Sequence, residues 1–210
     1  MKNEQITVGI FVFNDVEVLD FAGPFEVFSV ADRLREKPPF LPILISEKPG
    51  LIRGRGNFLV QPNFHFSNCP QLDMVVIPGG GGYAADGTGY GTRLEQSNPM
   101  LRTWLISQEK VVQRIMSVCS GALILAHAGL LDGQRATIHH GAYAELRAVG
   151  RGITVVEGVK HVDAGKVVSS GGISAGIDMS LTVVSQTIGS KAAQETADYM
   201  EYDWSAPVLS

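Results

Sequence analysis

The stretch RIMSVCSGALILAHAGLL, residues 114–131, places one cysteine between a run of strand-forming residues and a run of small, helix-forming residues. Cys119 is followed by Ser120 and Gly121, whose side chains are small enough for a sharp turn. A strand, a tight turn and a helix in this order are typical of a nucleophile elbow, which raises a reactive side chain above the edge of a parallel sheet. Backbone N–H groups at the start of the helix favour a thiolate, so the sequence predicts a lowered pKa for Cys119.

The alternative for Cys119 is a buried side chain that serves only as a small hydrophobe, which is the commonest fate of a free cysteine. We favour the nucleophile because the strand end, the Ser-Gly pair and the helix occur together. Cys69 differs, since it lies in the turn-forming segment SNCP (67–70) and nothing near it would activate a thiol. We therefore expect a structural role for Cys69, and no disulfide between the two cysteines.

Apolar, β-branched runs alternate with helical patterns along the whole chain. Several of these runs are too uniformly apolar for half-exposed strands and are expected to be buried and largely parallel. The alternation indicates βαβ units. It predicts an α/β, doubly wound sandwich with helices on both faces of a mostly parallel sheet, in a single domain over residues 1–210. The expected strands are 6–13, 42–45, 74–77, 111–118, 153–156 and 166–169, and the expected helices are 24–34, 99–109, 121–131, 142–149 and 175–188.

Two glycine-containing segments interrupt this alternation. In LIRGRGNFLVQPNF (51–64), two short strand-like runs flank glycines and predict a small β-hairpin insertion at an edge of the sheet. The segment GGGGYAADGTGYG (79–91) follows Pro78 and is expected to form a mobile loop at the carboxyl end of a strand. It lacks the Lys-Ser/Thr ending of a phosphate-binding loop, so nucleotide binding is disfavoured.

The composition argues against several classes of partner. The net charge is −4 and the 17 lysines and arginines are scattered, so there is no basic stripe for direct nucleic-acid binding. Residues 1–13 have too short an apolar run for a signal peptide or a membrane span, from which we expect a cytoplasmic protein without membrane contact. No cofactor is expected, and no metal, because these histidines lack companion ligands at metal spacing: His65, His127 and His161.

A nucleophile needs a partner that handles protons. The segment NDVEVLDFAGPFEVF (14–28) offers four carboxylates, of which Asp20 stands between Leu19 and Phe21. A carboxyl group in apolar surroundings has a raised pKa and can hold a proton close to a thiolate. The alternative role for Asp20 is to cap a helix that starts near Pro24.

A nucleophile also needs donors for the negative charge that develops on its substrate. Backbone N–H groups of Gly79 or Gly80, together with that of Ser120, are predicted to provide them, because both segments end at the carboxyl edge of the sheet. His139 and His140 follow a short expected strand, and a histidine there would complete a Cys-His pair. Two adjacent histidines before a helix can also serve only to cap it or to contact water.

The chain contains, in order, the segments LDFAGPFEVF, DMVVIPGG, SVCSGALILAHAGLLDGQRATIHH and GGISAGIDMSL. Together they resemble the ThiJ/PfpI superfamily, whose members are flavodoxin-like sandwiches with a cysteine at a nucleophile elbow. The resemblance runs from residue 6 to about residue 203. It is strongest to the isocyanide hydratase branch, which also contains the amidotransferase-like domains of AraC-type regulators.

By motif, the resemblance implies roles for individual residues. Cys119 matches the nucleophile and Asp20 the aspartate that manages protons, while Ser120 keeps the small, hydroxylated character of the residue after the nucleophile. His139 matches the histidine of a T-H-W stretch, but His140 stands where tryptophan is usual. In hydratases of this type the cysteine attacks the isocyanide carbon, and water releases an N-substituted formamide. The resemblance thus implies a cofactor-free hydro-lyase that acts on a small electrophile.

Two other functions stay open within the superfamily. A glutathione-independent glyoxalase or deglycase would use the same thiolate and a protonated carboxyl group on α-oxoaldehydes. A non-catalytic or redox sensor is the second, since an accessible low-pKa thiol is prone to oxidation, although we expect no room for a helix-turn-helix module before Ser210. A peptidase is disfavoured because Ser120 stands where the protease-like branch has histidine.

The resemblance also implies a homodimer, whose interface we expect at the first helix or at the hairpin 51–64. The segment GGISAGID (171–178) matches a family signature. Its helix is expected to pack beneath the site, and its glycines to serve tight turns. Asp178, within an apolar helix, should have a hydrogen-bonding partner.

Overall fold

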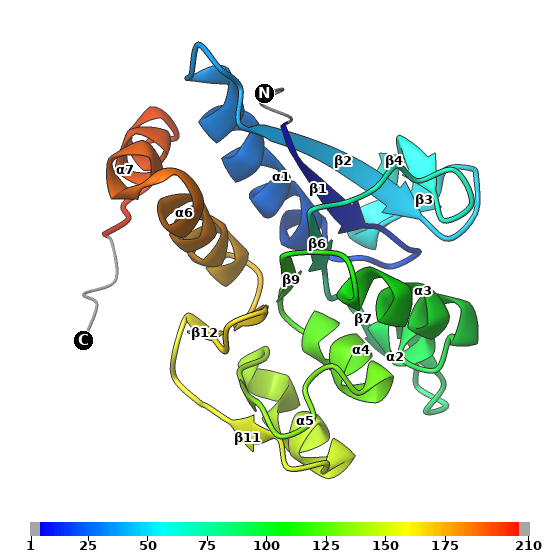
Figure 1. The fold of residues 1–210 in the computed structure, drawn as a ribbon. Coiled ribbons are helices and arrows are strands. Elements are labelled where there is room, and N and C mark those ends of the chain that lie inside the picture. Colours follow the sequence, from blue (N-terminus) through cyan, green and yellow to red (C-terminus); the bar gives the residue numbers. More distant parts are fainter. Residues whose placement is uncertain (1–4, 206–210) are drawn as a thin grey trace.

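A seven-stranded sheet runs through the centre of the protein in the computed structural model, which describes residues 5–205 (Figure 1). The strand order is β12-β13-β9-β6-β1-β2-β5, and all neighbours are parallel except the edge pair β12 and β13. The strands of this sheet are β1 (Ile6–Phe11), β2 (Phe40–Ser46), β5 (Phe64–His65), β6 (Met74–Ile77), β9 (Arg114–Ser117), β12 (His161–Asp163) and β13 (Val167–Ser170).

Helices cover both faces of this sheet, which confirms the predicted doubly wound sandwich (Figure 1). One group packs together on one face and consists of α1 (Val18–Arg33), α6 (Ala175–Ile188) and α7 (Ser190–Tyr199). The other group gathers around α4 and consists of α2 (Thr92–Glu95), α3 (Pro99–Glu109), α4 (Gly121–Ala128) and α5 (Tyr143–Val149). The central strands are buried between these two layers, and all four residues of β6 are buried. Their uniformly apolar sequences follow from this double burial.

The strand order reverses at β1, because the chain proceeds from β1 to β2 on one side and later from β6 to β9 on the other. In doubly wound sheets, ligands bind in the crevice outside the carboxyl ends of the strands at such a switch point. The loops that follow these strands touch one another. Val16 and Gly80 form an isolated bridge between the loops after β1 and β6, and the Val118 N–H donates to Ile77 O at 3.0 Å. The fold therefore gathers three loops at one edge of the sheet.

Small two-stranded sheets lie outside the seven-stranded sheet. The predicted insertion is confirmed as an antiparallel pair of β3 (Ile52–Arg53) and β4 (Leu59–Val60). The glycine-rich segment 79–91, expected as a mobile loop, instead contains a second antiparallel pair, β7 (Gly81–Tyr83) and β8 (Gly89–Gly91). The run at 153–156 was wrongly expected among the buried strands, since β11 (Thr154–Val155) pairs only with β10 (Arg135–Ala136), outside the main sheet.

The first helix begins earlier than the sequence predicts. Proline has no N–H and is usually confined to the first turn of a helix, which is why the start was placed at Pro24. In the structure α1 begins at Val18 and Pro24 lies inside it, buried. Asp20 therefore lies in the first helical turn and is not the N-cap, which is Glu17. The structure also contains α7, which the sequence analysis did not predict. Among residues 5–205, no helix combines the length and the apolar character that crossing a bilayer requires.

Candidate active site

Cys119 occupies a sharp turn between β9 and α4, so the predicted strand–turn–helix arrangement is confirmed. Its φ is 56°, a left-handed conformation that costs a non-glycine residue about 1–3 kcal/mol and that nucleophile elbows share. Gly121 permits the turn, because a Cβ atom on it would lie 2.1 Å from Ile77 O. The small residues that the sequence places after Cys119 are thus required by the close approach of the neighbouring strand.

The sulfur of Cys119 is nearly buried, with 8% of the residue exposed. Backbone N–H groups of Ile173 and Ser120 lie at the sulfur and lower its pKa, as the elbow geometry predicts. Burial and the nearby Asp20 carboxylate act more strongly in the opposite direction and raise the pKa of Cys119 to about 12. The predicted lowering of this pKa is therefore wrong, because the sequence does not reveal how completely the thiol is removed from water.

The Asp20 carboxyl group is fully buried beside this thiol. The pKa of Asp20 is raised to about 7, because burial and the charge of Glu17 outweigh the Gly79 N–H, the Cys119 thiol and Arg55, which lower it. The raised pKa is the one expected from the apolar neighbours of Asp20. Its Oδ2 atom accepts a hydrogen bond from the Gly79 N–H at 2.9 Å, and its Oδ1 atom has no hydrogen-bond partner among the described residues.

Asp20 and Cys119 titrate as a pair because their groups interact directly. The first proton leaves near pH 7 and the second near pH 12, so the pair holds one proton and one negative charge over the range between. Transfer of the thiol proton to the carboxylate within the pair gives a thiolate next to a carboxylic acid. The arrangement can thus supply a nucleophile and a proton donor without any change in net charge.

The glycines after β6 hold this pair in place. The Gly79 N–H donates to Asp20, and the Gly80 N–H donates to Ser120 Oγ at 3.1 Å, so neither is free for an oxyanion. The predicted oxyanion site at Gly79 and Gly80 is therefore not available in this structure. Ser120 Oγ in turn donates to Thr92 Oγ1 at 3.1 Å. A Cβ atom on Gly79 would lie 2.5 Å from Ser120 N, so the close contact between the two loops requires glycine.

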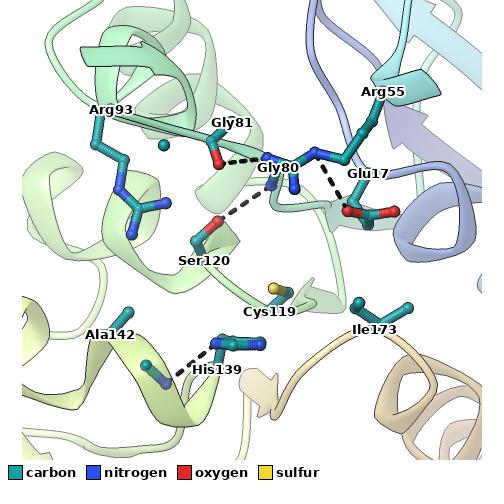
Figure 2. A pocket seen from close by; sticks show the side chains of 12 residues that line it. Glu17, Arg55, Gly80, Gly81, Arg93, Cys119, Ser120, His139, Ala142 and Ile173 are labelled. Atoms are coloured by element: carbon teal, nitrogen blue, oxygen red, sulfur yellow. Dashed lines mark hydrogen bonds and ion pairs between the residues drawn. The ribbon is translucent and has the colours of Figure 1, made fainter. Parts of the chain in front are cut away.

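A pocket of about 270 Å³ opens above the sulfur (Figure 2). Of the predicted site residues, Cys119, Ser120, Gly80 and His139 line it, whereas Gly79 and Asp20 lie behind its wall. Figure 2 shows the Cys119 sulfur between Ser120, His139 and Ile173. Among the lining residues that the sequence analysis did not assign to the site are Glu17, Arg55, Arg93 and Ile173.

His139 is a neutral, oriented side chain in this pocket. Its Nδ1 atom accepts a hydrogen bond from the Gly141 N–H at 3.1 Å, which places the ring proton of the neutral form on Nε2. Burial, His140 and Arg93 all lower the pKa of His139. The exposed His140 stacks on His139 with ring centroids 4.4 Å apart, and it is not among the residues that line the pocket. The residue that departs from the family pattern, His140, thus influences the pocket through its contact with His139.

The GGISAGID segment reaches the sulfur itself and does more than pack beneath the site. Ile173 has a left-handed φ of 47°, which directs its N–H toward Cys119. The preceding Gly171 accepts a hydrogen bond from the Cys119 N–H at 2.9 Å, and a Cβ atom on Gly172 would lie 2.4 Å from the His139 ring. The match of this segment to a family signature was the sequence signal for its position near the site. The role of its glycines was interpreted as tight turning alone.

Asp178, in the first turn of α6, has the hydrogen-bonding partners that its burial predicts. Lys160 Nζ lies 2.6 Å from its Oδ1 atom, and Tyr202 OH donates to its Oδ2 atom at 2.7 Å. These contacts fix the start of α6, which begins two residues after Ile173. Cys69 lies apart from the pocket, and burial raises the pKa of its thiol to about 11. Within residues 5–205, no group of three or more His, Cys, Asp or Glu side chains could hold a metal ion.

The protein is an α/β sandwich with a reversal of strand order, a cysteine at a left-handed turn and a buried acid beside that cysteine. Comparison with known families identifies the class to which it belongs. Residues 6–186 match the model of the DJ-1/PfpI family, and the chain belongs to that family. Its fold is the flavodoxin-like sandwich of this family, with additional small hairpins.

Particular relatives are similar to most of the chain. An isonitrile hydratase of Pseudomonas putida is 32% identical over 197 residues, which are 94% of this chain and 78% of that protein. The crystal structure of a ThiJ/PfpI family protein from Pseudomonas syringae matches with a TM-score of 0.82 and 24% identity, over 98% of this chain and 78% of the other. An AraC family transcriptional regulator from Pseudomonas putida shares the fold with a TM-score of 0.78 and 16% identity, over 93% of this chain and 99% of the other.

Proposed function

We propose that the protein is a cofactor-free hydratase in which Cys119 adds to a small electrophile, converting an isocyanide to an N-substituted formamide. The observation that carries this proposal is the buried Cys119–Asp20 pair, which holds one proton and one negative charge between about pH 7 and about pH 12. Similarity to an isonitrile hydratase over most of the chain supports the choice of substrate.

The pair accounts for each proton in this reaction. Asp20 takes the thiol proton, and the thiolate forms a C–S bond to the terminal isocyanide carbon. Asp20 then returns the proton to that carbon, which gives a thioformimidate, R–N=CH–S–Cys119. Asp20 next accepts a proton from water as the water oxygen bonds to the same carbon, and it passes this proton to the nitrogen, which gives R–NH–CH(OH)–S–Cys119. Asp20 then takes the hydroxyl proton as the C–S bond breaks, which releases R–NH–CHO and regenerates the Cys119 thiolate beside the protonated Asp20.

The other pocket residues hold charge during these steps. The N–H groups of Ile173 and Ser120 stabilise the sulfur when it carries negative charge, both before attack and as the C–S bond breaks. The Nε2–H of neutral His139 is the donor for the substrate nitrogen as that atom gains electron density. The glycines around the turn leave room for the substrate to approach the sulfur closely.

Formamide production from a simple aryl isocyanide, followed by absorbance, tests the proposal. Cys119→Ala should abolish turnover, and Asp20→Asn should reduce it strongly, while Cys69→Ala serves as the matched cysteine control. The same thiolate and proton donor would serve a glyoxalase, so methylglyoxal is tested in parallel. Consumption of methylglyoxal without isocyanide turnover would assign the glyoxalase reaction, and absence of both reactions would rule out the hydratase.

We also propose that the protein is a homodimer and that a second copy covers an apolar groove of about 410 Å³ along α1. The family resemblance implies a homodimer, and the first helix was one of its two expected interfaces. The groove contains side chains from α1, from β2, from the start of α6 and from Met200, which follows α7, so pairing would bury apolar surface next to the helix that carries Asp20. Its apolar side chains include Leu19, Phe21, Phe25, Leu44, Ile177 and Met200.

A further inference from the structure

Two arginines, Arg55 and Arg93, line the pocket above Cys119. The negative charges there are those of the Glu17 carboxylate and of the Cys119–Asp20 pair, and the pKa of His139 is lowered. A small uncharged electrophile would need no arginine, since apolar contacts and a few polar groups suffice to bind one. The two arginines therefore indicate that the organic group of the substrate, beyond its electrophilic carbon, is charged.

Arg93 is held rigidly by groups outside the pocket. Its Nε and Nη2 atoms donate to the two carboxylate oxygens of Glu145 at 3.1 Å and 2.7 Å, and its guanidinium carbon lies 5.6 Å from the centre of the Tyr83 ring. Tyr83 OH also donates to Glu145 at 3.2 Å, which closes the cluster. Only 11% of the Arg93 side chain is exposed. The guanidinium is thus fixed before any ligand arrives, so little conformational entropy is lost on binding.

The remaining edge of this guanidinium faces the pocket. Both hydrogen bonds that Arg93 donates within the described part of the chain use Nε and Nη2, which leaves the two protons of Nη1. Figure 2 shows the Arg93 guanidinium directed into the pocket, on the side of Ser120 and Ala142. A guanidinium edge binds a carboxylate or phosphate through short, charge-assisted hydrogen bonds.

Arg55, on the opposite side of the pocket, is a weaker anchor. Its Nη2 atom donates to Gly81 O at 2.7 Å, and its Nε atom lies 3.5 Å from the Glu17 carboxylate. Its side chain is 47% exposed, so water and salt screen its charge more effectively than that of Arg93. An anion in the pocket would therefore be held mainly by Arg93.

We propose that the pocket binds a carboxylate of the substrate at the Nη1 edge of Arg93, while the electrophilic carbon lies at Cys119. The identity of the electrophile as an isocyanide rests on the proposed function, but the carboxylate site does not. The substrate class is then an isocyanide that carries a carboxylate on its organic group. Arg93 determines specificity in this arrangement and takes no part in the proton transfers.

Protection of Cys119 from alkylation measures the carboxylate site without any turnover. Iodoacetamide labelling is followed by mass spectrometry at low salt, with Cys69 in the same molecules as an internal reference. Butanoate should protect Cys119 at about tenfold lower concentration than butanamide, which is the ratio that one charge-assisted hydrogen bond provides. Arg93→Met should abolish the difference, whereas Arg102→Met, at an exposed residue of α3, should keep it. Equal protection by the acid and the amide overturns the proposal.

Turnover of 3-isocyanopropanoate and of its methyl ester then separates the two proposals. We expect kcat/KM to favour the acid by about tenfold or more, mainly through KM, and Arg93→Met to remove this preference. Equal kcat/KM for acid and ester overturns the carboxylate site. Selective protection by butanoate without turnover of any isocyanide would instead refute the hydratase and leave the site intact.

Arg93→Met leaves the Glu145 carboxylate without its positively charged partner, so the variant needs a control for folding. The double variant Arg93→Met/Glu145→Gln removes both charges and keeps the region neutral. In this double variant, butanoate and butanamide should protect Cys119 from alkylation at equal concentrations. Persistence of the butanoate preference in the folded double variant would overturn the assignment to Arg93.

Discussion

Replacing Asp20 by asparagine removes the carboxylate that accepts the Cys119 proton, while keeping a carbonyl oxygen for the Gly79 N–H that donates to Asp20 at 2.9 Å. In the unaltered protein, burial raises the pKa of Asp20 to about 7, so the pair becomes neutral below that pH and no thiolate forms. Activity should then fall about tenfold per pH unit below pH 7. Above it, kcat/KM should be flat, because the pair keeps one negative charge up to the pKa of about 12 for Cys119.

In Asp20→Asn, a thiolate can form only by ionisation of Cys119 itself. The ordinary pKa of the thiol is 9.0, and burial raises it further, so at about pH 7.5 no more than about 3% of the thiol is ionised. A lost general acid removes typically about 10²–10⁴-fold in rate. We therefore expect kcat/KM at about pH 7.5 to fall at least about 10²-fold and to keep rising above pH 9, where the unaltered protein is flat.

The assay is a pH–rate profile of formamide production between about pH 5.5 and about pH 10. Alkylation of Cys119 by iodoacetamide at each pH reports thiolate formation independently of turnover. Glu17→Gln is the matched control, because the Glu17 charge raises the pKa of Asp20 and its removal should move the acidic limb to lower pH. The assignment of this titration to Asp20 would be refuted if the acidic limb of the Asp20→Asn profile stayed near pH 7 and kcat/KM fell less than about tenfold.

Three further substitutions test the framework of the site. Gly79→Ala places a Cβ atom 2.5 Å from Ser120 N, and urea denaturation should show a loss of about 1–3 kcal/mol from this overpacking; an unchanged midpoint would contradict the close approach. Tyr202→Phe removes the 2.7 Å hydrogen bond to Asp178 and should destabilise the protein by about 1.5–3 kcal/mol in the same assay, whereas a neutral effect would show that water replaces it. Phe25→Glu, in the apolar groove along α1, should give a monomer by light scattering, and an unchanged dimer would place the interface elsewhere.

The parts of the fold that the sequence predicted best are long or uniformly apolar. The bounds of β6, α3 and α6 match the predicted ranges, because their residues satisfy one regular pattern from end to end. The start of α1 was missed because local rules exclude proline from a helix interior, whereas packing against α6 stabilises the helix around Pro24. The hairpin β7–β8 was missed because glycine-rich sequences carry no strand pattern, and its pairing depends on backbone hydrogen bonds alone.

Some residues of the candidate site were likewise predicted from the sequence, and others were not. Cys119, Ser120 and the following glycine were found together, since a nucleophile elbow is encoded within a few consecutive residues. Asp20 was proposed from its apolar neighbours in sequence, and the structure buries its carboxyl group beside Cys119 instead of beside Leu19 and Phe21, which line the groove along α1. Arg93 was missed because the local sequence of α2 carries no signal of catalysis. Ile173 was missed because the signature around it predicts packing and tight turns and not an N–H group at the sulfur.

By itself, the sequence determined the elbow, its cysteine and an acid with a raised pKa, since these depend on residues close together along the chain. Only the tertiary structure decided that burial and Asp20 raise the pKa of Cys119, that the Gly79 N–H is used on Asp20, and that Arg93 faces the pocket. Desolvation and Coulomb interactions depend on distances through space and on the exclusion of water. Those quantities exist only once β1, β6 and β9 have brought their loops to one edge of the sheet.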